Sequence, residues 1–149
     1  MRLMEIQQSG RQSDQAFVAM WFTAETNLLY DEAIAPAVRD AGYRPFRVDR
    51  HEHVNRIDDE IIAQLRRSRF MVGDFTGQRQ GVYYEAGFMG GLGRRVIWMC
   101  PKEELHQVHF DTRQYSFIVY EDPAAARKGL YNRILAVEDE GPNATARKT

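Results

Sequence analysis

The chain has 149 residues, 44% of them hydrophobic, and its 20 basic and 21 acidic side chains give a formal net charge of -1. This length and composition predict one globular domain that buries a core without metal or disulfide cross-links, and the balanced charge argues against nucleic acid or an anionic membrane as a general partner. The single cysteine, Cys100, excludes an internal disulfide, and no apolar run approaches membrane-spanning length. We therefore expect a cytoplasmic protein in a reducing compartment.

The two ends of the chain differ from its middle. Residues 1–15 are mostly polar and lack the apolar stretch of a signal peptide, so we expect a flexible leader there. Residues 139–149 predict a disordered tail. The intervening residues 16–138 contain no repeat or linker and predict a single α/β domain.

Apolar runs alternate with helical patterns along this domain. The runs that predict buried parallel strands are residues 16–22, 43–48, 70–74, 96–100 and 117–120. Apolar residues at helical spacing predict helices between and after them, the first interrupted by Pro36, which should kink or shorten it. This order predicts a three-layer sandwich around a five-stranded parallel sheet, Rossmann-like in layering. Of the two common doubly wound strand orders, we expect the flavodoxin-like one.

Two acids mark the predicted sheet edge. The strand at 70–74 ends on Asp74, and Thr76, Gly77 and Gly81 bracket the expected turn after it. Glu85 lies in the expected first turn of the next helix beside an apolar stripe. Ligands of open parallel sheets bind outside the carboxyl ends of the strands, so both carboxylates are expected in one crevice. The positive end of the helix should keep Glu85 ionised, which suits a nucleophile.

Aromatic residues and further polar groups are expected around this crevice. Trp21 and Phe22 follow the first strand and either wall a pocket or cap the core. Gly81, Tyr83 and Tyr84 flank Glu85 and are candidate substrate-binding residues. A third acid, Asp111, precedes the last strand and joins this group of candidates.

Metal and phosphate sites are not expected from the local patterns. The chain has four histidines, which are typical of solvated loops and have no cysteine partners for a zinc site. They are His51, His53, His106 and His109. The cluster of Arg66, Arg67 and Arg69 matches the dipole at the end of a predicted helix, so we do not expect it to bind phosphate. The glycines within and after the central helix do not form a dinucleotide-binding fingerprint and favour close helix packing. We expect neither a metal nor a cofactor.

Two carboxylates among aromatic side chains are the equipment for cleaving a bond at an anomeric carbon. The motifs D-F-T at 74–76, G-V-Y-Y-E-A-G-F at 81–88 and G-L-G at 91–93 resemble the nucleoside 2-deoxyribosyltransferase family, and the likeness covers most of the chain. The resemblance implies that Glu85 attacks the sugar's anomeric carbon, that Asp74 ends the third strand beside it, and that a nucleoside or nucleotide is the substrate.

Departures from the family pattern leave the reaction open. Met89 replaces a small residue, and Arg79 stands where family transferases carry an acid six residues before the nucleophile, so hydrolysis and transfer are both possible outcomes. NAD-cleaving Toll/interleukin-receptor (TIR) domains are similar in topology and also place a Glu on this helix. A non-catalytic nucleotide-binding or signalling module is the third alternative, because one fold hosts many functions.

The outer face of the central helix predicts assembly. Tyr84, Phe88 and Gly91 are expected on a face away from the stripe that packs on the sheet, and a helix that is apolar on more than one face usually has a second partner. We expect a symmetric homodimer, as the resemblance also implies, unless the leader or the last helix covers this face.

Overall fold

The computed structural model describes residues 11–48, 59–108 and 116–144. In chain order, its helices and strands are β1 (Gln15–Ala19), α2 (Ala24–Leu29), η1 (Tyr30–Ile34), α3 (Ala35–Asp40), β2 (Arg44–Arg47), α5 (Asp59–Arg67), β3 (Phe70–Asp74), η2 (Thr76–Gln78), α6 (Gln80–Gly91), β4 (Arg95–Pro101), η3 (Lys102–Gln107), β5 (Ile118–Tyr120) and α7 (Pro123–Glu138). The five predicted strands are all present, and each lies within two or three residues of its expected bounds.

The strands form one sheet in the order β2-β1-β3-β4-β5, and every neighbouring pair is parallel. This is the flavodoxin-like order, so the predicted fold class is confirmed. The chain passes from β1 to its neighbour β2 on one side and then returns to β3 on the other side of β1. The space between the carboxyl ends of β1 and β3 is therefore the topological switch point. Ala19 pairs with Gly73 there, so Trp21 and Asp74 follow adjacent strand ends.

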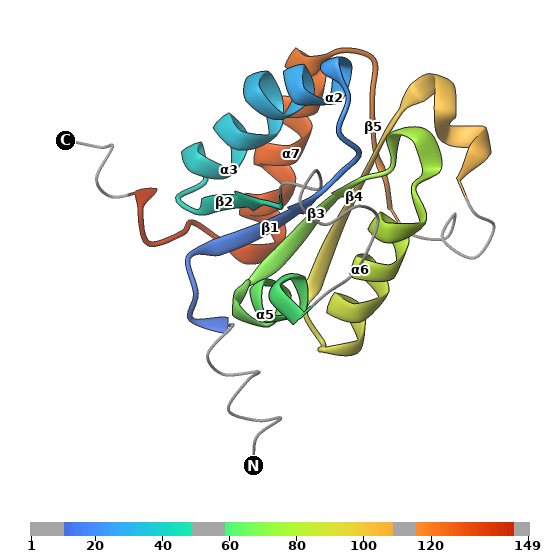
Figure 1. Ribbon diagram of the computed structural model, residues 1–149. Helices are drawn as coiled ribbons and strands as arrows, with labels where there is room; N and C mark the ends of the chain where they lie inside the picture. Colours follow the sequence, from blue (N-terminus) through green and yellow to red (C-terminus); the bar gives the residue numbers. More distant parts are fainter. Residues whose placement is uncertain (1–10, 49–58, 109–115, 145–149) are drawn as a thin grey trace.

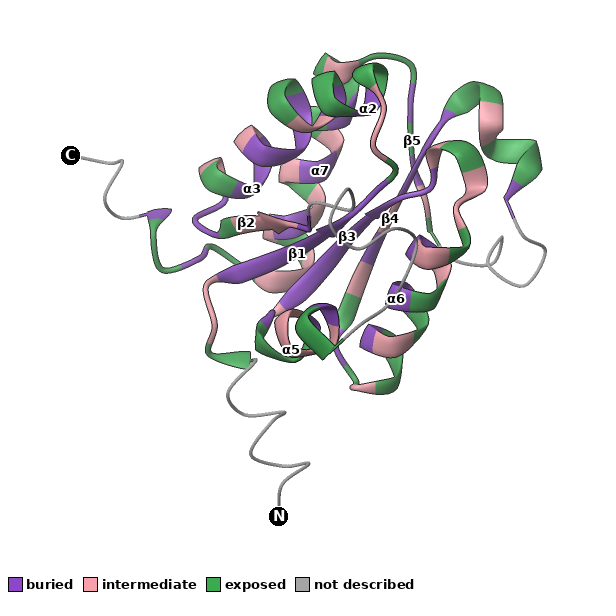
Figure 2. Ribbon diagram, in the orientation of Figure 1, coloured by how far each residue is buried: buried purple, intermediate pink, exposed green. Residues whose placement is uncertain are grey.

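Helices cover both faces of the sheet. Figure 1 shows α2, α3 and α7 on one side and α5 and α6 on the other. Strands β1 and β3 are completely buried between these layers (Figure 2). Side chains alternate along β3, so Phe70 and Val72 join the core under α3 and α7, whereas Met71 joins the core under α5 and α6.

The first crossover changes its helical form before Pro36, as its position in the sequence predicts. Thr23 caps α2 through a capping box with Thr26, and the π-helical turn η1 then connects α2 to α3. Within that turn the N–H of Ala35 bonds to the carbonyl of Tyr30, five residues back. A proline has no N–H and its ring crowds the preceding turn, so a local widening of the helix accommodates it.

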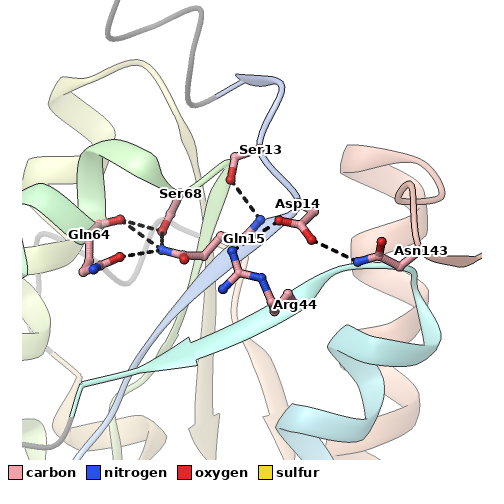
Figure 3. A network of polar contacts seen from close by, with 7 residues as sticks. All are labelled: Ser13, Asp14, Gln15, Arg44, Gln64, Ser68 and Asn143. Carbon is pink, nitrogen blue, oxygen red and sulfur yellow. Dashed lines mark hydrogen bonds and ion pairs between the residues drawn. The ribbon is translucent and has the colours of Figure 1, made fainter.

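Polar contacts fix the amino ends of the first two strands, as Figure 3 shows. The side-chain amide of Gln15 donates to Ser68 Oγ at 2.9 Å and to Gln64 Oε1 at 3.2 Å. Asp14 accepts bonds from Arg44 at 3.3 Å and from Asn143 at 3.1 Å. These contacts join α5, β2 and the segment after α7 to the start of β1.

The described part of the expected tail packs against the domain. Gly141 donates to the carbonyl of Ala41, and Asn143 donates to the carbonyl of Gly42. Gly42 has a φ of +96°, and a Cβ there would lie 2.6 Å from the carbonyl oxygen of Gly141, so this close approach needs glycine. Among the described helices, none combines the length and apolar composition needed to cross a membrane.

Candidate functional site

Asp74 is the last residue of β3 and is fully buried. It follows Phe70 and Val72 on the sheet face covered by α7, because alternate residues of a strand share a face. Its Oδ1 accepts hydrogen bonds from Thr76 N at 3.1 Å and Thr76 Oγ1 at 2.5 Å, and its Oδ2 accepts one from the phenol of Tyr120 at 2.5 Å.

Burial is the largest influence on the pKa values of Asp74 and Tyr120. It raises the pKa of Asp74 above its usual value, although the hydrogen bonds from Thr76 and Tyr120 act in the opposite direction. The pKa of Tyr120 is also raised, first by burial and then by the carboxylate it contacts. The phenol therefore keeps its proton near neutral pH and acts as the donor in this bond.

Glu85 lies on α6, where the structure corrects its predicted position. The helix begins at Gln80, so Glu85 is its sixth residue and belongs to the second turn, and the first turn contains no acid. The prediction of a first-turn carboxylate is wrong because Gly81 lies inside the helix and not in the preceding turn. Stabilisation by the helix dipole falls off within the first turn and cannot be assumed for Glu85.

The side chain of Glu85 is fully buried, like those of Val82, Ala86 and Met89 on the same helix. Those three residues pack in the core under α5 and α6, so this stripe of α6 faces the sheet. Asp74 lies on the opposite sheet face, and in the described part of the chain its hydrogen bonds go to Thr76 and Tyr120 and not to Glu85. Asp74 lies at the carboxyl edge and Glu85 lies on the following helix, and their joint action stays a prediction.

Family models and curated proteins provide no match to this chain.

Trp21 and the turn after β3 form the rim of this edge beside the switch point. A Cβ at Gly77 would lie 2.4 Å from the Trp21 ring, so the ring packs directly on that glycine, whose φ of +78° also favours glycine. Trp21 is 36% exposed, and the guanidinium of Arg79 lies 5.0 Å from its ring centroid. Glu104 holds the turn from η3 by accepting the Gly77 N–H at 2.9 Å.

Phe22 lies beside a second arginine on the same rim. The guanidinium of Arg47 lies 3.8 Å from the centroid of Phe22 and 5.0 Å from that of Tyr30, and it donates to the carbonyl of Trp21 at 3.0 Å. Stacking on aromatic rings holds a guanidinium in place while keeping its charge. The rim beside Asp74 therefore carries two ordered cations, Arg47 and Arg79.

The remaining predicted substrate-binding residues have different surroundings. Tyr83 packs on Phe75, with ring centroids 4.6 Å apart, and donates to Gln78 Oε1 at 2.5 Å, so its ring belongs to the core. Tyr84 is 55% exposed on the outer side of α6, and Gly81 is half-buried near the start of that helix. Asp111 lies outside the described residues.

Tyr120 and Thr76 are the polar partners that sequence reasoning did not assign to the site. Thr76 was only placed in the turn, although a threonine two residues after an acid is a common side-chain partner in such turns. Tyr120 is the last residue of the last strand, and parallel strands bring their carboxyl ends to one edge of the sheet. Its position at a strand end could therefore have predicted that Tyr120 lies near Asp74.

The described residues contain no cluster of three or more His, Cys, Asp or Glu side chains able to hold a metal ion. His51, His53 and His109 lie outside those residues. Cys100 is buried at the end of β4, and burial, followed by the charge of Asp74, raises the pKa of its thiol to about 12. A thiol with so high a pKa carries almost no thiolate and is not a nucleophile near neutral pH.

Proposed function

We propose that this protein cleaves the N-glycosidic bond of a nucleoside, nucleotide or related metabolite, with Glu85 as nucleophile and Asp74 positioning the sugar or base. The observation that carries the proposal is the complete burial of two carboxylates, Asp74 at the end of β3 beside the switch point and Glu85 on the helix that follows this strand. Burying an acid costs free energy, so such buried acids are candidates for function.

The hydrogen bonds of Asp74 suit a positioning role. A carboxylate offers about two acceptor sites on each oxygen. Thr76 occupies both sites on Oδ1, and Tyr120 occupies one on Oδ2, which leaves one acceptor site for a hydroxyl of the substrate. Because both acids are fully buried, the substrate reaches them only after side chains at the rim move.

The two rim arginines favour a phosphate-bearing substrate over an uncharged nucleoside. Guanidinium groups bind phosphate oxygens in pairs of parallel hydrogen bonds, and Arg47 and Arg79 are already held on aromatic rings. The planar ring of Trp21 offers a surface for a base beside these charges. Nucleoside monophosphates and NAD are therefore the first substrates to test.

Incubation with nucleosides, nucleoside monophosphates and NAD, followed by mass spectrometry for free base, tests the proposal. We expect base release from a phosphate-bearing member of the panel. Base exchange between two nucleosides would show transfer instead of hydrolysis, and free nicotinamide alone would favour the TIR-like alternative. If no member of the panel releases base, the catalytic proposal is overturned.

A non-catalytic nucleotide-binding module is the second candidate, and one observation favours it. Thr76 and Tyr120 occupy three of the four acceptor sites of Asp74, so this acid also serves the structure by joining β3 to β5. Binding of a nucleotide to the protein without turnover would support this candidate.

We also propose that the protein is a cytoplasmic homodimer that uses the outer face of α6. Tyr84, Gly87 and Gly91 are exposed there, and a Cβ at either glycine would meet no atom within 4 Å. The structure corrects one member of the predicted face, because Phe88 is partly buried against the core under α5 and α6. The proposed interface therefore consists of Tyr84, Gly87 and Gly91.

A further inference from the structure

A polar pocket lies at the amino edge of the sheet, at the opposite end of the strands from Asp74. Its volume is about 310 Å³, and its lining residues are Arg11, Arg69, Gly93, Arg94, Arg95 and Glu138. Arg69 immediately precedes β3 and Asp74 ends it, so the two sites are about 16 Å apart along that strand. We call this the arginine pocket.

Two of its four arginines have structural partners. Arg94 is buried, and its Nη1 donates to the carbonyls of Leu65, Arg66 and Ser68 at the end of α5. Arg69 donates to the carbonyl of Glu138 at 3.4 Å, and its Nε lies 3.7 Å from Glu138 Oε1 at the end of α7. These contacts cap two helix ends and hold the wall of the pocket in place.

The other two arginines leave a positive charge in excess. The pocket contains four guanidinium charges and the carboxylate of Glu138, and the carboxyl ends of α5 and α7 each add about half a negative charge. About two positive charges remain uncompensated. Arg11 and Arg95 are exposed, and within the described part of the chain neither guanidinium makes a hydrogen bond or an ion pair, although the charge of Arg95 acts on Glu138 from a distance.

The excess charge is local, because the whole chain has a formal net charge of -1. The cations are also close enough to affect one another: burial lowers the pKa of Arg94 most, and the charge of Arg11 lowers it further. An anion bound between these residues would relieve that repulsion. Gly93 forms part of the pocket wall, and a Cβ there would meet no atom within 4 Å, so this part of the pocket has room for an anion.

We propose that the arginine pocket binds a phosphate group, or two linked phosphate groups, of a small metabolite. Arg11 and Arg95 supply the hydrogen bonds, and Arg69 and Arg94 supply fixed positive charge behind them. Guanidinium groups match phosphate oxygens in geometry and charge. A volume of about 310 Å³ is at the lower end for ligand pockets and suits a small molecule.

Isothermal titration of the full chain with inorganic pyrophosphate in low-salt buffer tests this site. We expect binding that Arg95→Ala weakens roughly ten- to hundredfold, because a charge-assisted contact is lost. Arg11→Ala should weaken it similarly. Glu138→Gln should tighten it, since this change removes the one carboxylate in the pocket.

Arg127→Ala is the matched control, because Arg127 is exposed on α7 and pairs with Asp40 outside the pocket. It removes the same charge and should leave pyrophosphate binding unchanged. Equal weakening by Arg127→Ala and Arg95→Ala would overturn the site, as would absence of binding by the unaltered protein. Citrate binding as tightly as pyrophosphate would overturn the assignment to phosphate. These outcomes do not depend on Glu85 or on base release.

Discussion

The phenol oxygen of Tyr120 lies 2.5 Å from Oδ2 of Asp74, and this hydrogen bond joins the ends of β5 and β3 across the intervening strand β4. The two residues are 46 positions apart in the sequence. Both are buried, so the bond forms where water does not compete with it. It connects the candidate acid to the outer strand of the sheet.

Replacing Tyr120 with phenylalanine should destabilise the protein by about 1–3 kcal/mol at neutral pH, because Asp74 loses a donor while remaining buried. Urea unfolding followed by circular dichroism measures this free energy. Tyr131→Phe is the control, since Tyr131 is half-buried on α7 and its hydroxyl makes no hydrogen bond within the described residues. Equal stability of the Tyr120→Phe variant and the unaltered protein would show that the bond does not hold the site together.

Asp74→Asn should change how stability depends on pH. The pKa of Asp74 is raised in the folded protein, so between that pKa and the unfolded value of about 3.9 the folded state binds the proton more tightly. The free energy of unfolding of the unaltered protein should therefore rise, relative to the Asn variant, as the pH falls from 7 toward about 4. Thermal or urea unfolding of both proteins at several pH values gives this difference, in which the other titrating groups cancel. A relative loss of stability on acidification would show that the carboxylate is stabilised instead of penalised by its surroundings.

The sequence predicted the sheet well because the strands carry their own local signal. Phe70, Met71 and Val72 are consecutive and apolar, and such a run is typical of a strand buried on both faces. The acid after them therefore had to lie at the carboxyl edge. The strand order was a choice between the two common doubly wound orders, and no single residue decided it.

Features that depend on the turn before α6 were harder to predict. Arg79 precedes the helix without a side-chain cap, so no capping residue marks the start at Gln80. Gly77 and Gln78 both have positive φ and complete the turn early. Gly81 resembled a turn glycine although it lies within the helix, and this shifted the expected position of Glu85 by one turn.

Contacts between distant segments were not predictable from local patterns. The bond of Tyr120 to Asp74 requires the register of three strands. The arginine pocket gathers residues that precede β1, β3 and β4, the first residue of β4, and one residue from the end of α7. Its arginines come from distant parts of the sequence, and only the tertiary arrangement shows that their charges accumulate in one place.

Gly87→Glu tests the proposed dimer face. Light scattering of the unaltered protein should give twice the chain mass of 17.3 kDa, and the variant should give 17.3 kDa because a charged side chain enters the interface. The monomer should tolerate the change, since no atom lies within 4 Å of the added Cβ and glycine disfavours a helix by roughly 0.5–1 kcal/mol. Ala124→Glu, an exposed position of α7, is the matched control and should leave the dimer intact. A mass of 17.3 kDa for the unaltered protein at every concentration would rule the dimer out.

Glu85→Gln should reduce base release by at least about 10³-fold while leaving the fold intact, because the amide keeps the shape of the side chain and removes the negative charge of the nucleophile. The variant should be no less stable than the unaltered protein, since it buries an amide where the native chain buries an acid. Single-turnover assays with whichever substrate releases base, together with circular dichroism, separate lost chemistry from lost folding. Glu25→Gln alters an exposed acid of α2 and should leave base release unchanged. Near-normal turnover by Glu85→Gln in a folded protein would remove Glu85 from the mechanism and leave it as a buried structural acid of α6.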